Sequence, residues 1–187
     1  MQRKRLLVAL AIAWALVAAF AFTFFETRSA RSTPPPPQDT SNLRVPGGVA
    51  FSEFQGYETW QVISISNGSL LAVIVGNPQM IAAYKAGIPA NGKHVPDGAK
   101  MAKIHWTTKR NPDIPGQPLM PDTLHDVDFM VKDSKRFAAS GGWGYAQFDH
   151  DAASGEFKPM GTGAGCGFGC HTIVTKRDYV FSEYAKR

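Results

Sequence analysis

The chain has 187 residues, of which 44% are hydrophobic and 19% are charged, a composition that excludes an intrinsically disordered protein. Most of its formal net charge of +5 lies at the N-terminus, in Arg3-Lys4-Arg5 and in two arginines before residue 32. The remainder is nearly neutral and has no arginine stripe with interleaved aromatic residues. No nucleic-acid-binding face is therefore expected.

The N-terminal segment predicts a membrane anchor. An apolar run extends over residues 6–25, after the basic residues 1–5. About 20 residues at about 1.5 Å each span the roughly 30 Å hydrocarbon layer, whereas a cleavable signal has an apolar core of about 7 to 15 residues. We therefore favour an uncleaved transmembrane signal anchor. Small residues at positions 29 and 30 leave a cleaved signal peptide as the alternative.

The charge distribution also predicts the orientation and the domain boundaries. Basic residues at 1–5 are expected to stay in the cytoplasm, which places the rest of the chain on the periplasmic side of the bacterial inner membrane, either anchored or soluble after cleavage. Residues 26–42 contain the run Pro34 to Pro37 and predict an extended linker. One folded domain is expected over residues 43–187, because about 145 residues suffice for a single core.

This domain is predicted to be rich in β-strands. Alternating apolar and polar residues predict strands over residues 59–66, 100–107 and 125–132. A continuous apolar run predicts a buried strand over residues 70–75, and a further strand is expected over residues 143–148.

Two of these strands separate apolar from polar residues. In the strand over residues 100–107, alternation places Ala102, Ile104 and Trp106 opposite Met101, Lys103 and His105. In the strand over residues 125–132, it places Val127, Phe129 and Val131 opposite Asp126, Asp128, Met130 and Lys132. Lys103 and Asp128 are therefore each expected on the strand face away from a row of apolar residues.

Helices are predicted at two places. Asn77 as N-cap, Pro78 at the first position and Gly87 as stop predict a helix between them. Pro96-Asp97-Gly98 predicts a turn, and a second helix is expected over residues 178–185. The predicted fold class is mainly β or α+β, with an antiparallel β-sheet domain, a few short helices and one preceding N-terminal transmembrane helix.

The chemistry-bearing residues gather in Cys166-Gly167-Phe168-Gly169-Cys170-His171, which contains both cysteines of the chain. Two thiols followed directly by a histidine are typical of c-type haem attachment, where the thiols bond to the vinyl groups and the imidazole binds iron. The usual spacing has two intervening residues and this chain has three, although Gly167 and Gly169 could loop out the extra residue. A disulfide between Cys166 and Cys170 is the main alternative. A structural zinc site is a weaker one, because its fourth ligand is unidentified.

The other histidines and methionines form no recognisable metal-binding pattern. Surface or capping roles are expected for the scattered histidines His94, His105, His125 and His150. A methionine could in principle supply a sixth iron ligand, but packing is the expected role of Met101, Met120, Met130 and Met160.

Further segments accompany the cysteine motif: Asn77-Pro78 with Tyr84, Pro96-Asp97-Gly98 leading to Ala102-Lys103, residues 131–137, Gly142-Trp143-Gly144 and residues 178–181. Together they resemble the cytochrome P-460 family of small exported c-type haem proteins. The resemblance implies a β-rich homodimer with one covalently attached haem c per chain and an open sixth position on the iron. Cys166 and Cys170 would then form the two thioethers, and His171 would be the proximal iron ligand.

The resemblance also implies roles for Lys103 and Asp128, and it marks one departure from the family pattern at Ala72. Lys103 falls where the hydroxylamine-oxidising branch of the family carries a lysine cross-linked to the haem edge. Asp128 matches a glutamate of the distal pocket and keeps a carboxylate that could accept protons. Ala72 stands where an active member carries an arginine.

Three functional hypotheses remain open from the sequence. The first is an enzyme that oxidises hydroxylamine, passing protons to Asp128 or water and electrons to an external cytochrome. The second is a module that binds nitric oxide or carbon monoxide without turnover, as the cytochrome c′-β branch of the family does. The third is a haem-free, disulfide-bonded exported domain.

Overall fold

A computed structural model describes residues 38–160 and 165–186, and the side chain of Cys166 is not described. The predicted anchor over residues 6–25 and most of the predicted linker over residues 26–42 lie outside the described residues. Among the helices that the structure does describe, none is long and apolar enough to cross a membrane.

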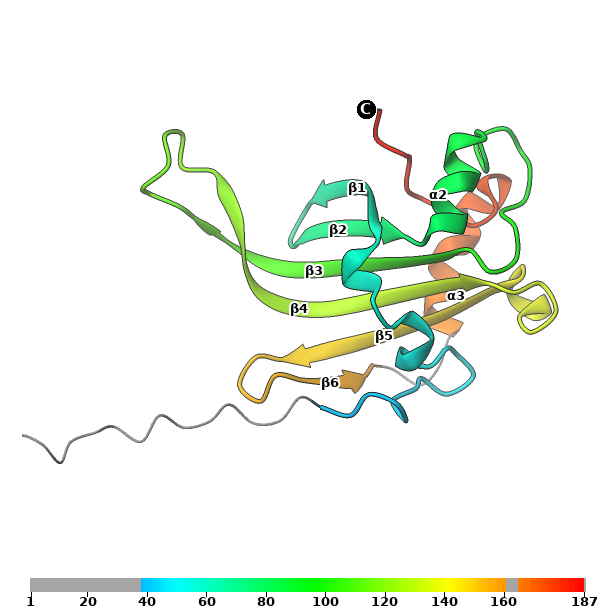
Figure 1. Cartoon of the computed structure of the whole chain (residues 1–187), viewed down its shortest axis with the longest axis horizontal. Helices are drawn as coiled ribbons and strands as arrows, with labels where there is room; N and C mark the ends of the chain where they lie inside the picture. Colours follow the sequence, from blue (N-terminus) through cyan, green and yellow to red (C-terminus); the bar gives the residue numbers. More distant parts are fainter. Residues whose placement is uncertain (1–37, 161–164, 187) are drawn as a thin grey trace, which may run out of the picture. The chain divides into compact units, whose positions relative to one another are not determined.

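Six strands form one antiparallel sheet in which each strand pairs with the next along the chain (Figure 1). The strands are β1 (Gln61–Asn67), β2 (Leu71–Gly76), β3 (Lys100–Arg110), β4 (Leu119–Lys132), β5 (Trp143–Asp151) and β6 (Glu156–Pro159). This topology confirms the predicted antiparallel sheet. The sequence patterns missed β6 and the first half of β4, where Pro121 and Asp122 have low strand propensity.

The helices are short. They are α2 (Pro78–Lys85), α3 (Gly165–His171) and four 3-10 helices over Phe51–Phe54, Tyr57–Thr59, Ala138–Ser140 and Thr172–Arg177. Helix α2 begins as predicted, because the Asn77 side chain accepts a hydrogen bond from the backbone N–H of Met80 at 2.9 Å. Gly87, with a φ of 79°, lies just after its end.

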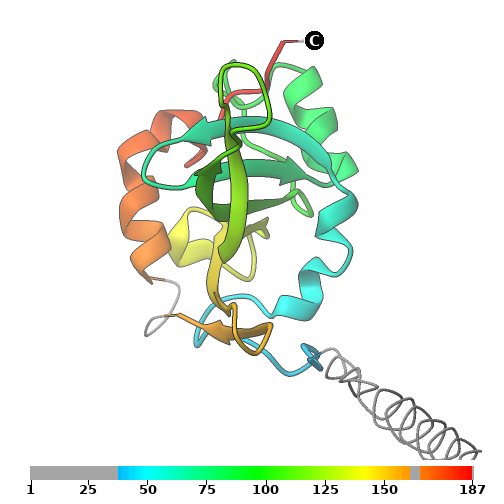
Figure 2. The same ribbon diagram turned by 90° about the vertical axis from the view of Figure 1, so that its left-hand side faces the viewer.

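One face of the sheet, which we call the aromatic face, carries a closed hydrophobic core. The segment with the first two 3-10 helices covers it, on the side of the sheet opposite α3 (Figure 2). The rings of Phe54 and Phe129 stack with centroids 4.1 Å apart, and Phe51 packs edge-on against both Phe129 and Phe148. These contacts stabilise the sheet from one side and leave its other face for Lys103 and Asp128.

The opposite face, which we call the cavity face, packs against α2, α3 and the C-terminal residues. Buried Met80 of α2, Met130 of β4 and Tyr145 of β5 belong to its hydrophobic cluster. Helix α3 lies close to β5, because a Cβ placed on Gly167 would lie 2.9 Å from the Cβ of Tyr145. Any larger residue at position 167 would push the helix off the sheet.

The predicted helix over residues 178–185 is wrong. Asp178 and Tyr179 have φ values of 48° and 65°, in the left-handed region that no right-handed helix contains. The Asp178 carboxylate accepts hydrogen bonds from the buried Lys132 ammonium at 2.9 and 3.0 Å, which holds the backbone in this turn. Residues 180–186, the rest of the described chain, have no regular structure, and the N–H of Ala185 bonds to the carbonyl of Ile63.

The segment around the cysteines also differs from the expectation of a looped-out residue. Residues Gly165–His171 form helix α3, and no glycine within it has a positive φ. Four residues make about one turn of an α-helix. The three-residue spacing between Cys166 and Cys170 is therefore the spacing of one helical turn, and no residue needs to be looped out.

Candidate functional site

A cavity of about 690 Å³ lies on the cavity face of the sheet. This volume is within the range of about 300 to 1,000 Å³ that is usual for ligand and cofactor pockets. One row of cross-strand neighbours, with one residue from each of β1 to β5, lines it: Ser64, Ile74, Lys103, Asp128 and Gln147. A second row adds Met101, Met130 and Tyr145.

The remaining wall comes from α3 and the residues after it. Cys170, His171 and Phe181 all line the cavity. The His171 ring packs against Tyr145 at 5.1 Å and edge-on against Phe181 at 4.8 Å, measured between ring centroids. The fold thus brings four predicted site residues, Lys103, Asp128, Cys170 and His171, to one cavity although they are up to 68 positions apart.

His171 is oriented by a backbone contact. Its Nδ1 lies 2.6 Å from the carbonyl oxygen of Tyr179, which can only accept, so Nδ1 carries the proton. Burial lowers the pKa of His171 despite this hydrogen bond, and the nearby charge of Lys103 lowers it further. A neutral imidazole whose Nδ1 is held by a carbonyl presents Nε2 as a metal ligand, the usual arrangement at metal sites.

The carbonyl of Tyr179 belongs to the turn at Asp178, where the 3-10 helix over Thr172–Arg177 ends. Lys132 and Asp178 are both almost fully buried, and the Lys132 ammonium also donates to the carbonyl of Gly141. A buried ion pair of this kind must keep both partners, because an unpaired charge in the interior is costly. The pair fixes Asp178, and with it the neighbouring carbonyl that orients His171.

Lys103 and Asp128 are direct cross-strand partners in β3 and β4. Burial raises the pKa of Asp128 to about 6, and the negative charge of Asp126 contributes to the rise, against the effects of His105 and Lys103. A carboxyl group with a pKa near neutrality can accept and release a proton under physiological conditions. The predicted strand faces of both residues are confirmed.

The cysteines are described in part. Cys170 has a free and exposed thiol at the cavity wall. The backbone of Cys166 belongs to α3, but its side chain lies outside the described residues. The exposed thiol of Cys170 beside His171 is compatible with a bond to a group bound in the cavity.

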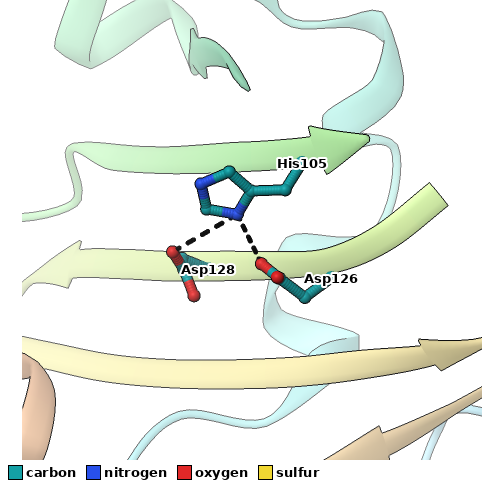
Figure 3. Close-up of side chains that lie close together, drawn as sticks. All are labelled: His105, Asp126 and Asp128. Atoms are coloured by element: carbon teal, nitrogen blue, oxygen red, sulfur yellow. Dashed lines mark hydrogen bonds and ion pairs between the residues drawn. The ribbon is translucent and has the colours of Figure 1, made fainter. Parts of the chain in front are cut away.

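The sequence patterns did not predict one cluster of titratable side chains beside the cavity. His105, Asp126 and Asp128 offer side-chain atoms that lie within 4.8 Å of one another (Figure 3). Alternation had placed all three on the same kind of strand face, but only the pairing of β3 with β4 brings His105 opposite Asp126. Surface or capping roles were expected for His105 and His125. His125 does lie at the surface, whereas His105 is mostly buried, and both bond to Asp126.

The other candidates have structural roles. His94 is exposed and its Nδ1 lies 2.9 Å from Asp178, and His150 contacts the carbonyl of Leu124. Met101 and Met130 are buried in packing, as expected. Ala72 is buried, is the cross-strand neighbour of His105 and carries no charge.

Comparison with known proteins gives one family. A sequence profile described as Cytochrome P460 matches residues 54–182, which contain all six strands and the complete cysteine motif. No curated protein matches the chain.

Proposed function

The chain belongs to the cytochrome P460 family, and from this premise we propose that its cavity holds one covalently attached haem c and that the haem protein oxidises hydroxylamine. The family implies a haem cofactor in general. The covalent attachment, the stoichiometry and the reaction are the proposal. The observation that carries it is the convergence of Lys103, Asp128, Cys170 and His171 on one cavity.

The residues at the cavity fit a haem. Its walls include apolar side chains such as Ile74, Met101 and Met130, which suit a flat macrocycle. Cys170 and His171 bring a thiol and an imidazole to the same cavity, and these are the donor types that a covalently attached haem requires.

Each side chain has a separate task in holding the group. Cys166 and Cys170 would provide the two thioethers, and His171 would bind the iron through Nε2, because Nδ1 is held by the Tyr179 carbonyl. Lys103 would bond through Nζ to a carbon at the edge of the macrocycle, in place of the hydrogen there. Replacing this C–H bond by a C–N bond releases two protons and two electrons, so an external oxidant such as dioxygen must take up the electrons.

When bound, the haem supplies an open iron position for the substrate and the capacity to take up its electrons. The protein supplies the proton acceptor. Asp128, with its pKa near 6, is a carboxylate at neutral pH and can take a proton from an N–H or O–H group in the cavity.

A binding module for nitric oxide is the second candidate, and the buried Ala72 favours it. Hydroxylamine-oxidising relatives would have an arginine at this position, whereas Ala72 is buried beside His105 and carries no charge. A protein of this kind would hold the gas at the haem without taking protons from it.

The proposal includes a location and partners. The apolar residues 6–25 support a chain anchored at the periplasmic side of the inner membrane, with soluble export after cleavage as the alternative. Electrons from hydroxylamine would pass to an external cytochrome. A homodimer is proposed from family membership.

Substitution of Lys103 tests the enzymatic proposal. Lys103→Arg should keep the thioether-bound haem but return its absorption spectrum to that of an ordinary pentacoordinate haem c, and hydroxylamine oxidation should be lost. Lys109→Arg is the matched control, because Lys109 lies on the same strand with an exposed side chain and pairs with Asp122. Absorption spectra and steady-state oxidation rates are measured on protein matured with c-type haem assembly.

Two results decide between the candidates. Loss of both the spectral feature and the oxidation in Lys103→Arg alone supports the enzyme. Identical spectra in all three proteins, with nitric oxide binding and no oxidation in any, would replace the enzyme with the gas-binding module.

A further inference from the structure

The polar residues behind the cavity wall form a chain that begins at Asp128. The Oδ2 of Asp128 lies 3.8 Å from Nδ1 of His105, and the same nitrogen lies 2.5 Å from Oδ1 of Asp126 (Figure 3). The second oxygen of Asp126, Oδ2, lies 2.5 Å from Nδ1 of His125. Asp126 therefore bonds to one histidine with each of its oxygens.

The residues of this chain lead from the cavity through the protein interior to the surface. Asp128 contributes its accessible part to the cavity wall. The side chains of His105 and Asp126 are 13% and 4% exposed, and that of His125 is 51% exposed. Titratable side chains therefore form a continuous line from the cavity to solvent, with no apolar side chain of the described residues between them.

We propose that His105 and Asp126 form a proton path from Asp128 to the surface at His125. The inference rests on the proposed function, because oxidation of hydroxylamine releases protons at the cavity. It gives a use to the buried carboxylate of Asp126, at a position where an apolar side chain would pack without a desolvation cost.

The geometry gives the order of transfers. With its own proton on Nε2, the His105 ring accepts a proton from Asp128 at Nδ1, and the resulting imidazolium passes that proton from Nδ1 to Asp126. Asp126 passes the proton to Nδ1 of a His125 ring that is protonated at Nε2, and the exposed ring releases its Nε2 proton to water and regains its starting tautomer by exchange with water. Each transfer moves one proton and no electron, since the electrons leave through the haem to the external cytochrome.

The charges around the chain determine where a proton rests. The groups that act on Asp128 come from β3, β4 and β5: Lys103, His105, Asp126 and Asp149. Burial by itself would raise the pKa of Asp126, but the hydrogen bonds from His105 and His125 outweigh it and lower that pKa. Asp128 therefore holds a proton more tightly than Asp126, so Asp126 carries one only in transit.

The first test replaces the exit residue. His125→Gln keeps a polar side chain at the surface but cannot carry a proton, so the kcat for hydroxylamine oxidation should fall by about tenfold or more. Added imidazole should restore it. His150→Gln is the matched control, because His150 is partly buried on the neighbouring strand and contacts a backbone carbonyl instead of Asp126.

The second test does not depend on activity. In the haem-bearing protein, the NMR shifts of the His125 ring should carry, besides the ring's own titration, a second inflection near pH 6 that reports the protonation of Asp128, and Asp128→Asn should remove this second inflection alone. If the unsubstituted protein oxidises no hydroxylamine but the coupled titration is present, the proposed function fails and the path stands. A His125 titration unaffected by Asp128→Asn, or equal rates for the two histidine variants, would overturn the path.

A bound divalent cation is the competing use of the same atoms, since His105, Asp126 and Asp128 could share one. Treatment with a chelator distinguishes the two. The path predicts that the rate and the coupled titration are unchanged by chelation, and loss of both on chelation, with recovery on adding Zn²⁺, would overturn it.

Discussion

The two faces of β3 and β4 differ although they are built from alternate residues of the same strands. Ile104 and Phe129 point into the aromatic face, where Phe129 is 1% exposed and stacks on Phe54. Their immediate neighbours Lys103 and Asp128 line the cavity, where the side chain of Asp128 is 35% exposed. Adjacent residues of one strand thus belong to the hydrophobic core and to the cavity wall in turn.

This difference explains how the sheet can hold charged residues beside a large opening. The aromatic face is closed by rings that contact one another in stacked and edge-on geometries. Such packing stabilises the sheet without help from the other side. The cavity face can therefore carry the Lys103–Asp128 pair and the neighbouring carboxylates of Asp126 and Asp128. Repulsion between these carboxylates lowers stability, and the aromatic face offsets that loss.

Truncation on the aromatic face should have the largest effect. Phe129→Ala removes a ring that contacts Phe51, Phe54, Tyr57 and Phe148, and the free energy of unfolding should fall by about 3 to 5 kcal/mol. Chemical denaturation measures it. A loss below 1 kcal/mol would show that the aromatic face does not stabilise the sheet.

Substitution at the contact between α3 and the sheet should have an intermediate effect. Gly167→Ala introduces a Cβ 2.9 Å from the Cβ and Cγ of Tyr145, so the free energy of unfolding should fall by about 1 to 3 kcal/mol. Gly169→Ala is the control in the same helix, because nothing lies within 4 Å of its Cβ position. It should stabilise α3 by about 0.5 to 1 kcal/mol. Equal effects of the two variants would contradict the close packing of α3.

Removal of the charge at Asp128 should have the smallest effect, with the opposite sign. Its pKa of about 6 lies above the ordinary value of 3.8, so the folded state binds the proton more tightly and loses stability as pH rises from about 4 to about 6. Asp128→Asn should therefore be more stable than the unsubstituted protein at pH 8, by about 1 kcal/mol after allowing for partial exposure. Thermal unfolding at pH 4 and pH 8 measures the difference.

The control for this prediction lies on the same strand. Asp122 is exposed and bonds to Lys109, and these contacts lower its pKa. Asp122→Asn should change stability by less than about 0.5 kcal/mol at pH 8. A destabilised Asp128→Asn at pH 8 would show that the Asp128 carboxylate is held by favourable partners instead of opposed by Asp126.

Local patterns in the sequence predicted the parts of the fold that depend on local physics. Alternation in β3 and β4 identified both faces, and Asn77 with Pro78 identified the start of α2. The same kind of pattern failed over residues 178–185, because the Lys132–Asp178 pair joins segments 46 positions apart and holds a left-handed turn. Tertiary contacts decided the structure there.

The residues of the candidate site were predictable from the sequence, but the hydrogen bonds between them and their neighbours were not. Cys170, His171, Lys103 and Asp128 were identified before the structure, and they line one cavity. The link from His105 to Asp126 depends on the register of β3 against β4, which shifts at Trp106. No pattern within either strand specifies that register.

Peptide mapping by mass spectrometry, on protein matured with c-type haem assembly, tests the central claim most directly. The account predicts one haem retained after acid extraction, on the peptide that contains Cys166 and Cys170 and cross-linked to the peptide that contains Lys103. A haem-free chain with a disulfide between Cys166 and Cys170 would contradict it.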